Sequence, residues 1–380
     1  MIYYIVLFVI LGAAIGIKPE QQKYKKGLLV GIIAFVCLVC GLRDMLGGYD
    51  NYIYGEIFDS TAQDIRMGYP LSMWSAFRWE HSEPLYAVWT VLVAFLTTNR
   101  YIFLLITAVT FYTLLYRHLT KYSEYPFIAL FIFLCLYYFF TFTYLRQILA
   151  IAITWFAIPY AIDRKPIPFI VITALGTLMH SGAVMFVLLY PIANRRFTRN
   201  QYIGLFVVVF LVGLTPIGSF LISTLGGEIN EAKAEQTVAG SGDARLDYIL
   251  EAGFFIWYFI NNFHRIGHSR YSTCMMNIAF LFILMLLMFV RFENGGRLTW
   301  VFMIGIACWV AEGISHTRKT DMTKIAMYGM MCLLYIRIVF AWGEMLTPYK
   351  TFLTNGVRYD AIWEKNEYDH RYDEDKLYKW

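Results

Sequence analysis

Charged residues are scarce in this chain. Asp, Glu, Lys and Arg make up 16% of its 380 residues, whereas soluble domains carry about a quarter. Hydrophobic residues take their place, at 59% of the chain, and the mean hydropathy is +0.53. This composition excludes an ordinary soluble domain and predicts an integral membrane protein.

Two further features are missing. No block of basic residues accounts for the net charge of +5, which comes from scattered loop residues, so no nucleic-acid partner is expected. No basic residue precedes the first apolar segment, residues 2–17, and no small-residue cleavage site follows it. We therefore expect this segment to remain in place as a transmembrane helix.

The sequence also offers no disulfide framework. Its six cysteines lie in or at the edge of apolar runs, where a thiol behaves as a small hydrophobic group. Cys37 and Cys40 form a C-x-x-C pair, but the pair lies inside a helix-length apolar run without the polar neighbours that redox or metal chemistry needs. We expect these cysteines to be structural.

Long apolar runs fill most of the chain and predict an all-α, polytopic membrane bundle. A hydropathy window of about 19 residues gives about twelve helices. They are expected at residues 2–17, 27–42, 84–98, 101–116, 127–144, 148–162, 167–190, 202–222, 248–260, 274–290, 298–311 and 325–342. The transmembrane domain therefore covers residues 1–342, and the tail 343–380 is expected to be a polar extension without chemistry.

The distribution of charge predicts which loops face the cytoplasm. Lysines and arginines gather in the short breaks at 18–26, 194–200, 261–273 and 315–324, which should be cytoplasmic. Residues 43–83 hold seven acids against three arginines, and residues 223–247 hold five acids against two bases. We expect both of these longer segments to lie on the outer side of the membrane.

Arg146 and His180 interrupt this simple pattern. Arg146 lies in an apolar stretch, and an intramembrane arginine needs a counter-ion, water or a substrate. Simple alternation places it at the cytoplasmic side and leaves His180 in the middle of the membrane. Alternatively, residues 167–190 form two half-helices that turn at His180 and Ser181, balanced by an amphipathic or re-entrant segment at 67–79. Both topologies are open, and in the second Arg146 and His180 face outward.

A glycine- and tyrosine-rich stretch follows the second expected helix. It reads GLRDMLGGYDNYIYGEIF at 41–58 and places Arg43 and Asp50 at the exit from the membrane. Aromatic rings stack on the apolar faces of sugars, while carboxylates and arginines bind the hydroxyl groups. The stretch is either a binding surface of this kind or an interfacial aromatic belt with solvated charges.

Five stretches together resemble a known family. They are the stretch at 41–58, EPLY at 83–86, LRQILAIAI at 145–153, ALGTLMHSGAVM at 174–185 and NGGRLTWVFMI at 294–304. Their order and spacing are similar to those of the EpsG family, whose members resemble Wzy-type polysaccharide polymerases. The resemblance runs from the second expected helix to about residue 305.

This resemblance implies a multi-pass enzyme of the bacterial inner membrane. Such an enzyme joins oligosaccharide repeat units, carried on polyprenyl pyrophosphate, at the outer face of the membrane. Its partners would be that lipid-linked oligosaccharide, the bilayer and other membrane proteins of polysaccharide assembly. The motif matches imply a site made of Arg43, Asp50, Glu83, Arg146, Gln147, His180 and Arg297.

The chemistry of such a reaction suggests roles for these residues. Arg146, with Arg43 or Arg297, can hold the pyrophosphate and stabilise the charge that grows on it. His180 is the leading candidate for the base that takes the acceptor proton, with Glu83 and Asp50 as rivals. No cofactor is expected, and because the apolar runs lack paired aspartates at ligand spacing we expect a metal-independent enzyme.

Two other classes of protein are compatible with this sequence. A transporter or flippase for lipid-linked sugars also needs cations that face a cavity, but no internal repeat favours it. A membrane-bound sugar acyltransferase also uses a membrane histidine, but no motif for binding an acyl donor is present. Polymerase is therefore the first prediction and these two are the alternatives.

Overall fold

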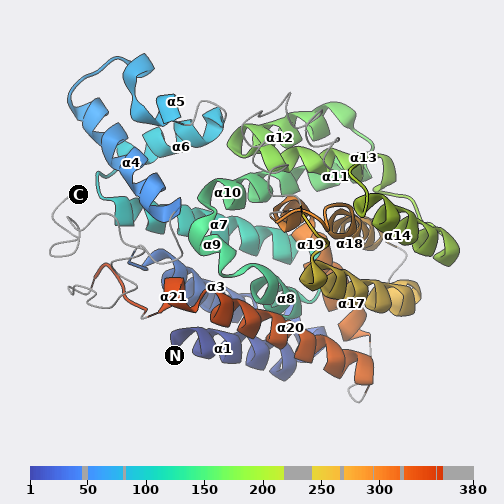
Figure 1. Cartoon of the computed structure of the whole chain (residues 1–380). Coiled ribbons are helices and arrows are strands. Elements are labelled where there is room, and N and C mark those ends of the chain that lie inside the picture. Colours follow the sequence, from blue (N-terminus) through green and yellow to red (C-terminus); the bar gives the residue numbers. More distant parts are fainter. Residues whose placement is uncertain are drawn as a thin grey trace.

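A computed structural model describes residues 1–44, 50–79, 83–217, 242–265, 269–293, 295–316, 321–347 and 349–353. This part of the chain is all-α, and its only extended pairing is one isolated bridge between Arg43 and Thr351. Figure 1 shows the helices packed largely side by side, with α1 and α20 along one edge and α4, α5 and α6 gathered at one end. The structure therefore confirms the all-α part of the predicted fold class.

Five helical segments within the described ranges are long and apolar enough to cross a membrane. They are α7 (Arg100–Tyr122), the run of α10 (Leu145–Thr154), η2 (Trp155–Ala157) and α11 (Ile158–Ile162), α18 (Arg270–Met288), the run of η6 (Gly295–Phe302) and α19 (Met303–Ser315), and α20 (Met322–Ala341). Shorter apolar segments are α1 (Ile2–Gly16), α3 (Lys26–Gly41), α6 (Pro84–Ala94), α8 (Pro126–Tyr137), α12 (Pro166–Met179), η3 (Ser181–Leu188) with α13 (Leu189–Ile192), and α14 (Arg199–Gly213). The expectation of about twelve membrane helices, short spans included, is thus met in part, by five long candidates and several shorter apolar helices.

The centre of the bundle is α8, whose residues are all buried. It packs against α1, α19 and α20. A helix that is apolar on every face can be stable only when other helices surround it, and the sequence PFIALFIFLCLY has this character. The second densely packed layer is formed by α18 and α19, and α17 (Leu246–Asn262) and α14 pack on α18 from outside.

The segment predicted to lie outside the membrane folds into helices that hydropathy did not show. Residues Asp50–Arg66 form α4, followed by the short η1 (Leu71–Met73) and α5 (Ser75–Trp79). α4 packs on α5, α6 and α7, and the side chain of Arg100 in α7 forms an ion pair of 2.6 Å with Asp59 of α4. The segment 67–79, considered above as amphipathic or re-entrant, consists of two short turns.

Residues 167–190 do not form one continuous helix. α12 ends at His180, and the chain turns back through η3 and α13. The two ends of this hairpin meet, because Arg164 donates a hydrogen bond of 2.5 Å to the carbonyl of Tyr190 and Asn194 donates one of 2.7 Å to the carbonyl of Ile162. The structure therefore has the turn at His180 and Ser181 that the second topology requires.

The hairpin is short for a membrane crossing. An α-helix of the length of α12 rises about 21 Å, whereas the hydrocarbon core of a bilayer is about 30 Å thick. α12 packs along α10, and Arg146 at the start of α10 and the Ser181 N–H just beyond the end of α12 both contact Glu83. Arg146 and the turn at His180 therefore lie close together in the bundle.

The first residues beyond 342 belong to the fold. Leu346 accepts a hydrogen bond from Tyr3 in α1, the ring of Phe352 stacks on Tyr101 at 5.4 Å, and Tyr349 donates to the carbonyl of Val39 at 2.9 Å. The expected polar tail therefore begins with a docked segment. The rest of it, residues 354–380, lies outside the described residues, as does most of the expected outer segment 223–247.

The sidedness of the hairpin can be tested by cysteine labelling. We expect single cysteines at Ser181 and at Tyr144, in a background without the six native cysteines, to react from outside with a membrane-impermeant thiol reagent. A cysteine at Lys165, which lies at the base of the hairpin, is the matched control and should react only after the membrane is opened. The opposite pattern would place His180 on the cytoplasmic side.

Candidate functional site

The site begins with one ion pair between two helix starts. Glu83 is the N-cap residue of α6, and Arg146 is the second residue of α10. Their side chains meet at 2.9 Å between Nη1 and Oε2, with the Glu83 side chain fully buried and 25% of the Arg146 side chain exposed. Arg146 therefore has the anionic partner that an arginine among apolar helices needs.

A tyrosine of α4 completes the surroundings of Arg146. The Nε–H of Arg146 donates a hydrogen bond of 3.1 Å to the hydroxyl oxygen of Tyr54. The guanidinium also lies over the Tyr54 ring, 5.2 Å from its centre, which is a cation–π arrangement. The plane of the guanidinium is thus fixed by three groups, the carboxylate, the hydroxyl and the ring.

The tip of the hairpin is attached to the same carboxylate. The backbone N–H of Ser181 donates to Oε1 of Glu83 at 3.1 Å. Each oxygen of Glu83 therefore has a different partner, since Oε2 faces Arg146. Because the side chain is fully buried, these contacts offset the cost of removing the carboxylate from water.

His180 caps the turn that follows it. Its Nδ1 accepts the backbone N–H of Gly182 at 3.1 Å, so a neutral ring in this conformation carries its proton on Nε2. A Cβ added at Gly182 would lie 3.2 Å from the His180 ring and 3.9 Å from Nε2 of Gln147. The histidine ring, Gly182 and Gln147 thus meet at the hairpin tip.

Gln147 connects this group to the segment 295–302. Its Nε2 donates a hydrogen bond of 2.7 Å to the carbonyl of Arg297. The guanidinium of Arg297 in turn donates to the hydroxyl of Tyr144 at 2.6 Å and lies 4.1 Å from the centre of that ring. Five of the seven residues implied by the resemblance are therefore connected, and we call them the linked group: Glu83, Arg146, Gln147, His180 and Arg297. Glu83 contacts Arg146 and Gln147 contacts Arg297 directly, whereas His180 joins them through its chain neighbour Ser181, whose N–H binds Glu83.

The other two residues lie differently. Asp50, the first residue of α4, is close enough to Tyr144 for the two to interact electrostatically, so it borders the linked group. Arg43 is completely buried. It donates to the carbonyl of Cys40 at 2.5 Å, to Asn51 Oδ1 at 3.2 Å and to the carbonyl of Phe142. These contacts favour a structural role, in which Arg43 ties α3 to the start of α4 and to α9 (Phe140–Thr143).

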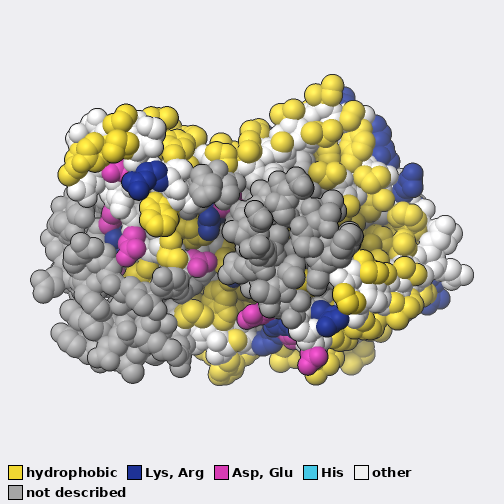
Figure 2. Space-filling view, turned by 45° about the horizontal axis from the view of Figure 1, so that its top comes forward, with side chains coloured by type: hydrophobic (Ala, Val, Ile, Leu, Met, Phe, Trp, Pro, Cys, Tyr) yellow, Lys and Arg dark blue, Asp and Glu magenta, His cyan; other side chains and the backbone are white. Residues whose placement is uncertain are grey.

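Acidic side chains are concentrated in one band on the face of the molecule shown in Figure 2. In Figure 2 the visible Asp and Glu side chains run diagonally through the middle of the face with Lys and Arg among them, and apolar side chains cover the flank on the right. No three His, Cys, Asp or Glu side chains gather as a metal-binding group anywhere in the described ranges. The expectation of a metal-independent site stays a prediction.

Three members of the site were not assigned to it from the sequence. Tyr54, Tyr144 and the backbone of Ser181 each contact one of the expected residues. Tyr54 and Tyr144 lie inside or next to the motif stretches at 41–58 and 145–153, so those stretches were the available signal. Because the chain has 29 tyrosines, the residue type alone does not single out these two.

The fold and this buried, ion-paired cluster define a polytopic helical membrane protein with a polar site recessed among its helices. Comparison with family models identifies the family: residues 28–352 match the EpsG family model, and the chain belongs to that family. Family membership implies a role in exopolysaccharide biosynthesis. The comparison with curated proteins and that with solved structures found no match.

Proposed function

We propose that this protein is a polysaccharide polymerase. It would join oligosaccharide repeat units, carried on polyprenyl pyrophosphate, at the outer face of the bacterial inner membrane. The observation that carries the proposal is the attachment of Arg146 and the hairpin tip at Ser181 to one buried carboxylate, that of Glu83. This attachment places a cation, an imidazole and an amide in one recessed group.

The proposed reaction exchanges one bond at the anomeric carbon of the donor. The bond from this carbon to the pyrophosphate oxygen breaks, and a bond to the acceptor hydroxyl oxygen forms. The hydroxyl proton passes to a base, and the polyprenyl pyrophosphate leaves with the bonding electrons. Guanidinium groups suit the stabilisation of this leaving group because they bind phosphate oxygens in pairs, and Arg146 and Arg297 are the arginines of the linked group.

Glu83 takes a positioning role in this proposal. Its carboxylate is fully buried between the Arg146 guanidinium and the Ser181 N–H, so each of its oxygens already has a partner. It is better suited to orienting Arg146 and the hairpin tip than to taking the acceptor proton.

His180 can take the acceptor proton only after the hydrogen bonding of its ring changes. Because Nδ1 accepts a hydrogen bond from the backbone N–H of Gly182, this hydrogen bond must break before the neutral ring can act as a base. In the conformation seen here, Nε2 carries a proton and can donate it to an oxygen of the substrate. His180 thus has two possible chemical roles, as base or as donor, besides its role as a cap.

A transporter of lipid-linked oligosaccharides is the second candidate. The observation that favours it is the broken hairpin at His180, because discontinuous helices that meet inside the membrane are typical of secondary transporters. Deletion of the gene distinguishes the two. For a polymerase, we expect single repeat units to be exported and polymer growth to stop after one unit, which gel analysis of the glycan would show.

A different result of the same deletion would favour the transporter. If the deletion strain retains single lipid-linked units on the inner leaflet, where an impermeant glycosidase cannot reach them, the protein exports units rather than joins them. Purified protein in proteoliposomes with lipid-linked repeat units gives the direct comparison. A ladder of longer products formed without any other protein would support polymerisation.

A further inference from the structure

A cavity of about 430 Å³ lies beside the linked group. Residues of α17, α18, η6 and α20 line it, together with Phe140 of α9 and Tyr144. Tyr144 and Arg297 belong both to this cavity and to the contacts described above. The cavity is therefore a continuation of the candidate site and not a separate pocket.

One wall of the cavity is aromatic. The rings of Phe140 and Trp300 stack with their centres 4.5 Å apart, and Trp342 meets Phe140 edge-on at 5.3 Å. Tyr144 lies 5.1 Å from Trp300 and extends this wall toward Arg297. These side chains come from α9, η6 and the end of α20, so three separate parts of the chain build one apolar surface.

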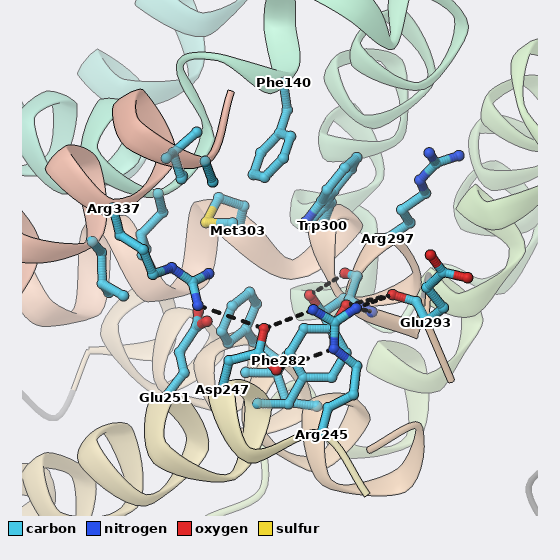
Figure 3. Close-up of a pocket in the computed structure, with 18 of the residues that line it drawn as sticks. Phe140, Arg245, Asp247, Glu251, Phe282, Glu293, Arg297, Trp300, Met303 and Arg337 are labelled. Atoms are coloured by element: carbon cyan, nitrogen blue, oxygen red, sulfur yellow. Dashed lines mark hydrogen bonds and ion pairs between the residues drawn. The ribbon is translucent and has the colours of Figure 1, made fainter. Parts of the chain in front are cut away.

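The opposite side carries ionised groups. Figure 3 shows Arg245 and Arg337 approaching Asp247 from opposite sides. Arg245 binds Asp247 through two hydrogen bonds of 3.1 and 2.8 Å, and Arg337 lies 3.5 Å from the same carboxylate. Glu251, one turn further along α17, also lines the cavity.

Backbone contacts hold this charged edge in place. Arg245 donates a hydrogen bond of 2.6 Å to the carbonyl of Glu293, and Tyr248 donates one of 3.1 Å to the same carbonyl. The Arg245 guanidinium also lies 4.5 Å from the centre of the Tyr248 ring. Burial acts to raise the pKa of Asp247, but the hydrogen bonds and the charge of Arg245 outweigh it, so the pKa is lowered and the group is a permanent anion.

The balance of charge limits which ligand fits. The arginines that line the cavity are Arg245, Arg297 and Arg337, and the acids are Asp247, Glu251 and Glu293. Burial raises the pKa of Glu251 to about 7, so this carboxyl is only partly ionised near neutral pH, and the three arginines are nearly balanced by Asp247, Glu293 and part of the charge of Glu251. The cavity therefore carries little excess positive charge with which to attract a pyrophosphate. It does combine a stacking surface with hydrogen-bond donors and acceptors at fixed positions, which is what a sugar with apolar ring faces and several hydroxyl groups requires.

We infer that this cavity is a saccharide subsite, which binds sugar residues of the growing glycan or of the incoming repeat unit. The sugars would contact the aromatic wall and the charged edge formed by Asp247, Arg245 and Arg337. The inference rests on the proposed function, because it places the glycan beside Arg297 and Tyr144, where the polymerase reaction would occur. It also gives Asp247 and Trp342 a role as specificity-determining residues.

The test measures binding without catalysis. The probe is the lipid-free oligosaccharide released by mild acid from the lipid-linked repeat units of the host strain, titrated into purified protein and followed by calorimetry. Trp342→Ala and Asp247→Asn are each expected to weaken binding roughly tenfold or more, as for the loss of one stacked ring or one ionic hydrogen bond. Trp342→Phe should restore most of the affinity, because it retains a ring.

Matched controls lie outside the cavity. Trp257→Ala removes a tryptophan from α17 that is 44% exposed and does not line the cavity, and Asp163→Asn removes an exposed carboxylate that also faces an arginine, Arg270. Both controls should bind the oligosaccharide as the wild type does. A thermal unfolding curve for each variant shows whether it is folded.

Three results would overturn the inference. The first is wild-type affinity in both Trp342→Ala and Asp247→Asn, and the second is no binding by the wild type at all. The third is a loss of binding to sugar-free polyprenyl pyrophosphate in the same variants, since that would make the cavity the pyrophosphate site. None of these results decides the proposed function, because the product ladder in proteoliposomes is measured separately.

Discussion

Arg146→Lys is expected to stop polymer growth while leaving a folded protein in the membrane. Lysine keeps the positive charge opposite Glu83, so the buried carboxylate retains a counter-ion. It lacks the planar fork with which arginine contacts Glu83 and Tyr54 together and with which it can bind two phosphate oxygens. The change therefore removes the geometry of the cation and not its charge.

The expected size of the loss is about a hundredfold or more in turnover. Losing one preorganised donor to a developing negative charge costs about 10²–10³ in rate in other enzymes. Arg146→Ala should be worse in a second respect, because it leaves Glu83 buried without its cation. Removing one partner of a buried ion pair costs about 3–5 kcal/mol, so the alanine variant is expected to unfold at a lower temperature as well.

Arg100→Lys is the matched control for this prediction. Arg100 also forms a buried pair with a carboxylate, since it contacts Asp59 through Nε and Nη2 with only 2% of its side chain exposed. The pair joins α7 to α4 and lies outside the linked group. We expect Arg100→Lys to lower the unfolding temperature and to retain turnover per folded molecule.

Comparing Arg146→Lys with Arg100→Lys separates a role in the reaction from a role in stability. Turnover is measured on proteoliposomes with lipid-linked repeat units, and unfolding is followed by tryptophan fluorescence in detergent. Polymer of normal length from Arg146→Lys would remove the pyrophosphate role from Arg146. Equal losses of turnover in Arg146→Lys and Arg100→Lys would mean that both arginines act only through stability.

Helix positions followed from composition because the membrane selects apolar residues along the whole length of a crossing. The run Leu145–Ile162 was expected as 148–162, and α18 as 274–290. Composition did not decide between one helix over 167–190 and two half-helices that turn at His180 and Ser181. The residues on both sides of the turn are equally apolar, and the contact that holds the tip, from Ser181 to Glu83, joins residues 98 positions apart.

The contacts of Arg43 could not be predicted from the sequence either. Its place in a glycine-rich exit from a membrane helix suggested an exposed, sugar-binding cation. In the fold its guanidinium is enclosed, over the ring of Phe142 at 5.3 Å and against a carbonyl 99 positions away. A sequence shows that an arginine next to the membrane must be neutralised or solvated, but it does not show whether carbonyls, a carboxylate or a ligand will do so.

Arg146 and Gln147 were expected at a site because a cation and an amide interrupt an apolar helix, whereas Glu83 was implied only by the resemblance to the EpsG family. Ionised and amide side chains among apolar helices are costly to bury, so they indicate either a functional site or a structural ion pair. Their mutual arrangement was not available from the sequence. Contacts such as the one from Gln147 to the carbonyl of Arg297, 150 positions apart, depend on the packing of α10 against η6.

His180 offers the second large expected effect, and two amide substitutions separate its possible roles. Asn places an acceptor oxygen near the position of Nδ1, so His180→Asn should still accept the Gly182 N–H and cap η3. It has nothing at the position of Nε2. Gln places its amide near Nε2 instead, so His180→Gln should lose the cap at a cost of about 1 kcal/mol.

If the imidazole acts in the reaction, both variants lose turnover whatever happens to the cap. We expect losses of about 10²–10⁴, the usual contribution of a positioned acid or base, together with near-normal unfolding temperature and oligosaccharide binding in His180→Asn. If His180 only caps the turn, His180→Asn should turn over at nearly the wild-type rate while His180→Gln is less stable. That second pattern, measured on purified protein with lipid-linked repeat units, would remove His180 from the chemistry and leave Asp50, beside Tyr144, as the base to examine next, because Glu83 is held by Arg146 and Ser181.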